Sequence, residues 1–168
     1  LNNLQPGYRN FTVKDLIDIK GKKKLTQIMV SNAFEASAAE EAGNDLILAK
    51  PDENVPLIRK AASKTFMTVS IPFIKYSSKE AIVKKAFELV EHGADSIHCG
   101  SWNLNFMKYL NEFKIPFQGH AGLVPRKSTW IGGVRAFGKN MDEASKLLNE
   151  IKDIEDTGAW GVEVECVP

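Results

Sequence analysis

The stretch Gly158-Ala-Trp-Gly-Val-Glu-Val-Glu-Cys-Val-Pro168 predicts the end of a helix, followed by a short strand that stops at a proline. In an extended chain the valines and the cysteine point to one side, and Glu163 and Glu165 point to the other. A carboxylate near the carboxyl end of an apolar strand is costly to bury unless it is paired, hydrogen-bonded or used in chemistry. Because α/β proteins keep their reactive groups at this end of their strands, Glu165 is the first candidate site residue.

Two earlier stretches repeat this junction between a helix and a strand. Glu41-Ala-Gly43-Asn-Asp45 and Glu91-His-Gly93-Ala-Asp95 match Asp156-Thr-Gly158-Ala-Trp160, and each carries a glycine where a helix ends. The spacing of apolar residues between the junctions predicts alternating helices and strands. The expected helices span residues 11–20, 34–42, 52–63, 78–91, 104–113 and 142–156, and the expected strands span 25–31, 45–49, 66–71, 96–100, 116–120 and the closing stretch.

A strand followed by a helix, repeated six times, calls for a parallel sheet with right-handed crossovers. The regular junctions favour equal units arranged around one barrel. We therefore expect an α/β fold of the (β/α)8 TIM-type barrel class, with about six units visible and the C-terminal units absent from this chain. Residues 1–168 would form a single, partial barrel domain. A complete doubly wound open sheet is the alternative, and it would need no missing part.

The composition is ordinary for a soluble globular protein. The formal net charge of +1 argues against nucleic acid or an acidic surface as the main partner. No apolar segment approaches the ~20 residues that a membrane helix needs, and the first residues lack the pattern of a signal peptide. Cys99 and Cys166 lie in strand-like stretches, so we expect buried free thiols in a reducing cytoplasm.

Polar residues at the carboxyl ends of the expected strands are the candidates for chemistry, and each also has a purely structural interpretation. A lone histidine in a strand is commonly a hydrogen-bonded structural residue. Asp52 could cap the helix that follows it, and Ser70 could bond its own backbone. The full set is Asn32, Lys50, Asp52, Ser70, His98, Cys99, His120 and Glu165.

Three of these residues converge if the fold is a barrel. His98, His120 and Glu165 end strands four, five and six, and would therefore face one mouth of the barrel. Two histidines and a carboxylate could bind a divalent transition metal. They could equally form an acid/base group for proton abstraction. Glu163 lies on the same face but deeper, and we expect no role for it.

Three segments carry a resemblance to a known family. Gly119-His-Ala-Gly-Leu-Val-Pro125, Ile131-Gly-Gly-Val-Arg-Ala-Phe-Gly138 and Val164-Glu-Cys-Val-Pro168 resemble ketopantoate hydroxymethyltransferase, also called 3-methyl-2-oxobutanoate hydroxymethyltransferase. Thr12-Val-Lys-Asp-Leu16 and Glu40-Glu-Ala-Gly43 are similar to the opening units of that family. The family belongs to the phosphoenolpyruvate mutase/isocitrate lyase superfamily of barrels.

The resemblance implies a magnesium-dependent transferase of pantothenate biosynthesis. The α-proton of 3-methyl-2-oxobutanoate is removed, and the enolate attacks the one-carbon unit of 5,10-methylenetetrahydrofolate to give ketopantoate. It also implies a cytoplasmic homo-oligomer with a small oxo-acid substrate and Mg²⁺ as cofactor. By motif match Glu165 corresponds to the catalytic base, and His120 corresponds to the histidine of the family's Gly-His in strand five.

The sequence departs from the family pattern at the expected metal site. Where the family has Gly-Asp-Ser, this chain has Lys50-Pro51-Asp52. Ser70 stands in place of a metal-linked aspartate of the family. The family's Lys-x-Glu is replaced by His98-Cys99-Gly100. The resemblance therefore implies His98, Asp52 and Ser70 as substrate-binding residues and Asp52 as a metal ligand. Three hypotheses follow: the family reaction at a rebuilt site, other enolate or carbon–carbon chemistry on an oxo-acid, or a non-catalytic oligomeric barrel protein.

Overall fold

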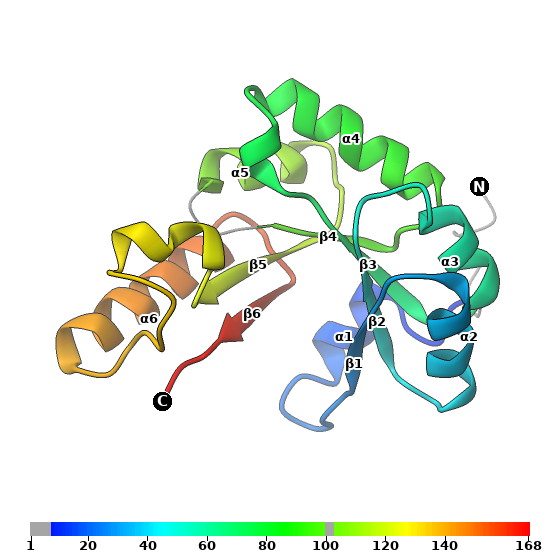
Figure 1. Cartoon of the computed structure of the whole chain (residues 1–168), viewed down its shortest axis with the longest axis horizontal. Coiled ribbons are helices and arrows are strands. Elements are labelled where there is room, and N and C mark those ends of the chain that lie inside the picture. Colours follow the sequence, from blue (N-terminus) through cyan, green and yellow to red (C-terminus); the bar gives the residue numbers. More distant parts are fainter. Residues whose placement is uncertain (1–7, 100–102) are drawn as a thin grey trace. The chain divides into compact units, whose positions relative to one another are not determined.

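A computed structural model of the chain describes residues 8–99 and 103–168 (Figure 1). Strands and helices alternate as the sequence predicts, with small shifts at the ends of the elements. Within the described ranges, no helix combines the length and the apolar composition needed to cross a bilayer. The elements are α1 (Val13–Asp18), β1 (Gln27–Val30), α2 (Ala33–Glu41), β2 (Leu46–Ala49), α3 (Val55–Ala61), β3 (Phe66–Ser70), η2 (Phe73–Lys75), α4 (Lys79–Glu91), β4 (Ser96–His98), α5 (Leu104–Glu112), β5 (Phe117–Gly122), η4 (Pro125–Trp130), α6 (Met141–Glu155) and β6 (Gly161–Glu165).

The strands pair in parallel and in chain order. Gln27 of β1 lies opposite Leu46 of β2, Leu46 lies opposite Phe66 of β3, and Gln118 of β5 lies opposite Gly161 of β6. The order along the sheet is β1-β2-β3-β4-β5-β6. A doubly wound sheet reverses its strand order at a switch point, whereas consecutive order is that of a β/α barrel. The predicted α/β barrel class is confirmed, and the open-sheet alternative is wrong.

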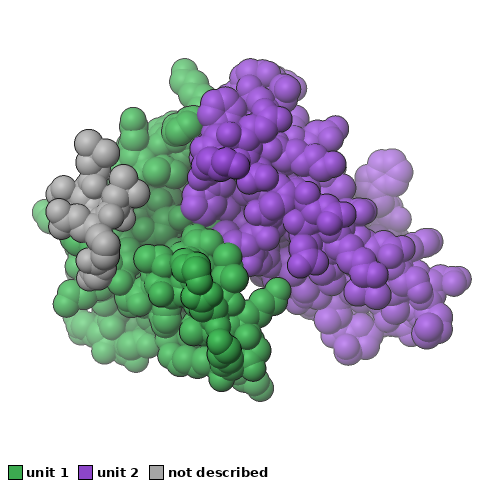
Figure 2. Space-filling model, turned by 180° about the vertical axis from the view of Figure 1, so that it is seen from behind, with its two compact units in different colours: residues 1–71, 84–97 green, residues 72–83, 98–168 purple. Residues whose placement is uncertain are grey.

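The chain divides into two compact units (Figure 2). Unit 1 comprises residues 1–71 and 84–97, and unit 2 comprises residues 72–83 and 98–168. Strands β1 to β3 belong to unit 1, and β5 and β6 belong to unit 2. The expectation of one partial barrel domain stays a prediction. Gly100, at which strand four was expected to end, lies outside the described residues.

The core of unit 1 consists of β2, β3 and the helices that follow the first strands. All four residues of β2 are buried, as are Phe66 to Val69 of β3. A parallel strand covered on both faces has a continuous apolar sequence rather than an alternating one, and such runs predict β2 and β3 from the sequence. From the helices, Ala36, Ala39 and Ile58 complete this core.

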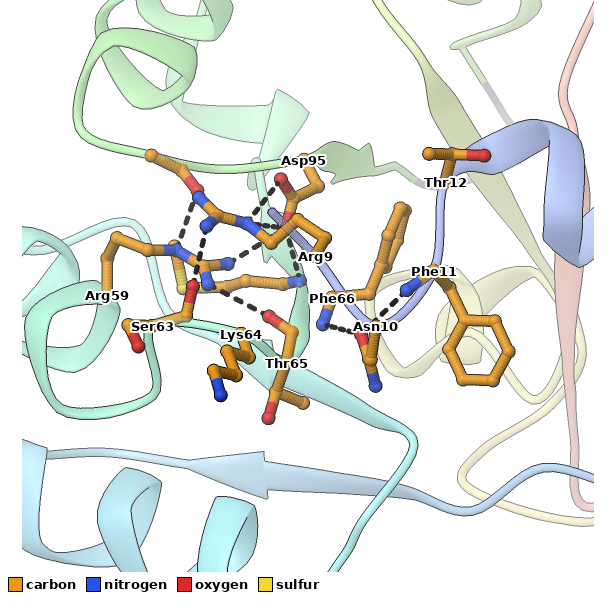
Figure 3. A network of polar contacts seen from close by, with 12 residues as sticks. Arg9, Asn10, Phe11, Thr12, Arg59, Ser63, Lys64, Thr65, Phe66 and Asp95 are labelled. Atoms are coloured by element: carbon orange, nitrogen blue, oxygen red, sulfur yellow. Dashed lines mark hydrogen bonds and ion pairs between the residues drawn. The ribbon is translucent and has the colours of Figure 1, made fainter. Parts of the chain in front are cut away.

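A network of charged side chains closes unit 1 at the amino-terminal ends of its strands (Figure 3). The Arg9 Nε donates to Asp95 Oδ1 at 3.0 Å, and the Arg59 Nη2 donates to Asp95 Oδ2 at 2.8 Å. The backbone N–H of Met67 also donates to Asp95 Oδ2 at 2.8 Å. Burial lowers the pKa of Arg59 to about 10, although Asp95 opposes that effect. We call Arg9, Arg59 and Asp95 the arginine network.

The core of unit 2 is built around β5, which is buried along its whole length. Met107 and Leu110 of α5 and Ile154 of α6 are buried in this core. Helix α6 approaches β5 so closely that a Cβ on Gly119 would lie 2.4 Å from Ile154 Cγ2. A glycine is therefore required there for the helix to pack against the strand that carries His120.

Two expectations about burial are wrong. In the helix expected at residues 78–91, Phe87 is one of the apolar residues at helical spacing and should be buried, but it is 45% exposed, whereas Leu89 is fully buried. The buried face of α4 instead runs through Ala86 and Leu89, and Phe87 points about 100° away from Ala86. Cys99 is buried as expected, but Cys166 is exposed because the chain leaves the sheet after Glu165, with Cys166 at a φ of 48°.

Candidate functional site

Strand β6 presents two carboxylates at its carboxyl end, next to β5. The register of the parallel pair sets His120 of β5 opposite Glu163 and Gly122 opposite Glu165. Since alternate residues of a strand share a face, Glu163 and Glu165 lie on the same side as His120. The side chains of Glu163 and Glu165 are 38% and 36% exposed, whereas that of His120 is only 11% exposed. The strand pairing thus holds a buried imidazole beside two carboxylates that reach solvent.

Each carboxylate contacts one histidine. The Nε2 of His120 lies 3.0 Å from Oε2 of Glu165, and the Nε2 of His98 lies 3.0 Å from Oε2 of Glu163. The centroids of the two imidazole rings are 5.2 Å apart. We call these four residues, all in unit 2, the histidine–glutamate group.

The structure thus brings together His98, His120 and Glu165, as the sequence predicts. It adds Glu163, for which no role was expected. The alternation of β6 already puts Glu163 on the face of Glu165, but its contact with His98 depends on the alignment of the strands, which the local sequence does not indicate. The functional roles of the predicted residues remain predictions.

The surroundings of the group set its charge near neutral pH. Burial lowers the pKa of His120, and the neighbouring His98 lowers it further, although the glutamates oppose the shift. The hydrogen bond with His98 lowers the pKa of Glu163 below its ordinary value of 4.5, against the effect of burial. Near pH 7 His120 is therefore neutral and Glu163 ionised. A neutral imidazole beside a carboxylate can accept or pass on a proton.

The other predicted site residues, Asp52 and Ser70, belong to unit 1. Asp52 accepts a hydrogen bond from the backbone N–H of Asn54 at 2.9 Å, so it stabilises the turn before α3. The N-cap position of that helix is Asn54 and not Asp52, which corrects the expected cap. Ser70 ends β3 and is half-buried. Their assignment to substrate and metal binding stays a prediction.

A hollow of about 450 Å³ lies in unit 2 beside the end of β5. Its wall includes Gly122, two residues beyond His120, together with residues of the following loop and of α6. The size is within the range of small-molecule sites, which is ~300–1,000 Å³. The lining residues are Leu104, Gly122, Lys127, Ile131, Phe137, Lys146, Asn149, Glu150 and Asp153.

The backbone at this end of β5 and β6 is tightly joined. The N–H of Leu123 donates to the carbonyl of Glu165 at 2.8 Å. Gly122 has a φ of 79°, and a Cβ there would lie 2.3 Å from that carbonyl oxygen. Only glycine fits this approach, so Gly122 fixes the place at which Glu165 leaves the sheet.

The donor set of the histidine–glutamate group does not fit the Mg²⁺ that the resemblance implied. Ligand atoms of His120, Glu163 and Glu165 all lie within 4.8 Å of one another, so these residues could hold a metal ion. Mg²⁺ prefers oxygen ligands in an octahedral arrangement, and this group contributes an imidazole nitrogen. At two of the metal positions that the resemblance implies, this chain has Ser70 and Gly100, and neither residue supplies a carboxylate.

Solved structures establish the class of protein to which this fold belongs. The structure of 2,3-dimethylmalate lyase, a member of the PEP mutase/isocitrate lyase superfamily, matches with a TM-score of 0.65 at 10% identity, over 91% of this chain and 61% of that chain. The carboxyl transferase domain of Rhizobium etli pyruvate carboxylase matches with a TM-score of 0.60 at 14% identity, over 90% of this chain and 29% of that chain. The protein is of the α/β-barrel class.

Sequence comparison then identifies the family. The family model of ketopantoate hydroxymethyltransferase matches residues 53–168. The 3-methyl-2-oxobutanoate hydroxymethyltransferase of Kosmotoga olearia is 31% identical over 92% of this chain and 67% of its own length. That of Pyrococcus furiosus is 30% identical over 95% of this chain and 64% of its own length. The chain belongs to the ketopantoate hydroxymethyltransferase family, and it spans about two thirds of the length of these relatives.

Proposed function

We propose that this protein transfers a hydroxymethyl group from 5,10-methylenetetrahydrofolate to 3-methyl-2-oxobutanoate, giving ketopantoate in pantothenate biosynthesis. Membership of the transferase family supports this function. The observation that carries it is the 3.0 Å contact between His120 and Glu165, two residues that lie in separate family-like segments of the sequence. We extend the proposal to a cytoplasmic homo-oligomer, on the resemblance alone.

In the proposed reaction Glu165 is the base that removes the α-proton of the oxo-acid. Its carboxylate reaches solvent and therefore has access to a bound substrate. The neutral imidazole of His120 contacts the same carboxylate and can share the proton that Glu165 takes up. The resulting enolate attacks the one-carbon unit of the folate co-substrate, a molecule of water supplies the hydroxyl group, and ketopantoate and tetrahydrofolate are released.

On the same resemblance, we propose that residues at the carboxyl ends of strands bind the substrate. His98, at the position of a family lysine, would bind the negatively charged oxo-acid. Ser70 and Asp52 of unit 1 are kept as substrate-binding candidates on the resemblance alone. Asp52 would be the one carboxylate left for Mg²⁺.

The test is the formation of ketopantoate by the purified protein from the oxo-acid, methylenetetrahydrofolate and a divalent cation. Glu165→Gln should lower kcat by about 10²- to 10⁴-fold, because amide nitrogen and oxygen cannot act as the base. Glu155→Gln, an exposed position on α6, is the matched control and should leave kcat unchanged. Absence of ketopantoate with every divalent cation tested would contradict the proposal.

The pairing of His98 with Glu163 favours a second candidate function within the same chemistry. A family lysine is replaced by a histidine, and its partner is a carboxylate of β6. This pair would hold a substrate differently, so related enolate chemistry on another oxo-acid is the alternative. A series of 2-oxo acids in the same assay separates the two: preferred turnover of another acid would favour the alternative.

A further inference from the structure

The residues His120, Glu163 and Glu165 form a compact set of metal-binding atoms in unit 2. One ligand atom from each residue lies within 4.8 Å of the other two. His120 is buried, and the two carboxylates are more than one-third exposed, so an ion could enter from solvent. Such a site would be supported by the protein on one side and open to added ligands on the other.

The distances within this set are close to those of a coordination shell. Two atoms that each bind one metal at about 2.1 Å, at a right angle, lie about 3.0 Å apart. The Nε2 of His120 and Oε2 of Glu165 are 3.0 Å apart. In a tetrahedral shell with the same metal–ligand distance the ligand atoms lie about 3.4 Å apart, so the widest separation in the set must shorten by at most about 1.4 Å. The side chains of Glu163 and Glu165 are 38% and 36% exposed, so their rotation is the movement that would bring the ligand atoms closer.

The backbone holds the three residues in place without an ion. The register of β5 and β6 puts His120 opposite Glu163, and Glu165 follows on the same face. Sites on strands are positioned more precisely than sites on loops. The close approach of Gly122 to the carbonyl of Glu165 fixes the end of the strand as well.

His98 supplies the support that carboxylate ligands need. Its Nε2 lies 3.0 Å from Oε2 of Glu163. In metal sites, ligating carboxylates are commonly held by hydrogen bonds from a second layer of residues. His98 would therefore orient Glu163 instead of binding the ion itself.

We propose that His120, Glu163 and Glu165 bind one divalent transition-metal ion, with His98 positioning Glu163. One imidazole and two carboxylates suit ions such as Zn²⁺, Co²⁺ or Mn²⁺, whereas Mg²⁺ prefers oxygen ligands alone. The competing account is that the set is only two histidine–glutamate ion pairs, which need no metal. Ion binding separates these accounts directly.

The inference shares Glu165 and His120 with the proposed transferase function but does not rest on that function. Binding is measured on the resting protein without oxo-acid or folate. A protein that binds the ion and makes no ketopantoate would support the metal site and contradict the transferase. A protein that makes ketopantoate and binds no transition metal would do the reverse.

The experiment uses untagged protein, because a histidine tag would bind the same ions. After removal of metals, Zn²⁺ and Co²⁺ are titrated by calorimetry, and metal content is measured by mass spectrometry after dialysis. We expect one ion per chain. Glu163→Gln and His120→Asn should weaken binding by at least about 100-fold, and His98→Asn by about 10-fold.

Matched controls keep the result specific. His92→Asn removes the remaining histidine of the chain, and Glu155→Gln removes an exposed carboxylate of unit 2; both should bind as the unaltered protein does. Circular dichroism and thermal melting identify variants that do not fold, and Glu163→Gln preserves the size of the side chain.

Three results would overturn the proposal. The first is absence of stoichiometric binding of Zn²⁺ and Co²⁺ by the folded protein. The second is equal affinity of the unaltered protein and Glu163→Gln. The third is loss of binding in Cys166→Ser with Glu163→Gln unaffected, since the ion would then sit on the exposed thiol.

Discussion

The arginine network of unit 1 and the histidine–glutamate group of unit 2 use opposite charges in different ways. The side chains of Arg9, Arg59 and Asp95 are 4%, 11% and 10% exposed, and Asp95 accepts hydrogen bonds on both oxygens. The carboxylates of Glu163 and Glu165 are 38% and 36% exposed. The arginine network is buried and its carboxylate is hydrogen-bonded on both oxygens, whereas the histidine–glutamate group keeps its carboxylates accessible to solvent.

The difference follows the two ends of the strands. Asp95 immediately precedes β4, and Glu165 is the last residue of β6. In β/α barrels the amino-terminal ends of strands serve stability, and the carboxyl ends carry the chemistry. Removing a charge from the arginine network should therefore destabilise the fold. Removing one from the histidine–glutamate group should impair function.

The largest expected effect on stability is that of Asp95→Asn. It removes the carboxylate that pairs with the buried guanidinium groups of both Arg9 and Arg59, which should cost about 3–5 kcal/mol of unfolding free energy. Urea denaturation measures the change. The control is Asp18→Asn, whose exposed pair with Lys14 should contribute less than about 1 kcal/mol. An equal loss of unfolding free energy in Asp95→Asn and Asp18→Asn would contradict the claim that the buried network stabilises the fold more than an exposed ion pair.

In contrast to Asp95→Asn, Glu165→Gln should impair activity and leave the stability nearly unchanged. Because its carboxylate is open to solvent, the unfolding free energy should fall by less than about 1 kcal/mol while ketopantoate formation is lost. The same urea series measures the stability, and the transferase assay measures the activity. A loss of stability as large as that of Asp95→Asn would make Glu165 a structural residue.

The stability that Glu163 contributes should depend on pH. Its pKa in the fold lies below the ordinary value of 4.5, chiefly through the hydrogen bond with His98. Ionised Glu163 therefore stabilises the fold above pH 4.5, and this contribution is lost as the pH falls through the lowered value. Glu163→Gln should be destabilising at pH 6 and less so at pH 3, measured by thermal melting. A difference that grows as the pH falls would contradict the pairing with His98.

The smallest effect on stability is expected for substitution of Cys166, which follows Glu165 in the sequence. Cys166 is exposed and Cys99 is buried, with burial raising the pKa of the Cys99 thiol. Ellman's reagent should therefore titrate one thiol in the folded protein and two in urea. Cys166→Ser should abolish the folded-state reaction and leave the unfolding free energy within about 0.5 kcal/mol. Reaction of both thiols in the folded protein would contradict the burial of Cys99.

The sequence was sufficient for the features that depend on neighbouring residues. Thr12 and Asp15 form the capping box of α1, and Gly43 and Gly93 adopt the positive φ expected after a helix. The continuous apolar residues of β2 and β3 identify buried parallel strands. Barrel class and family followed from the repeated junctions and from the segments near Gly119 and Glu165.

Features that depend on distant residues were not predictable. Arg9 and Asp95 are 86 positions apart, and nothing near either residue indicates the pair. The contact of His98 with Glu163 depends on how the strands are aligned, and a shift of one residue would turn Glu163 away. The exposure of Cys166 follows from a turn whose left-handed residue is not a glycine.

The central claim is that Glu165 acts as a base on an oxo-acid, and proton exchange tests it most directly. The protein is incubated with 3-methyl-2-oxobutanoate in D₂O without folate, and loss of the hydrogen at C3 is followed by proton NMR. We predict exchange that is at least about 100-fold slower in Glu165→Gln than in the unaltered protein and is unchanged in Glu155→Gln. Equal exchange rates in the unaltered protein and Glu165→Gln would contradict the claim.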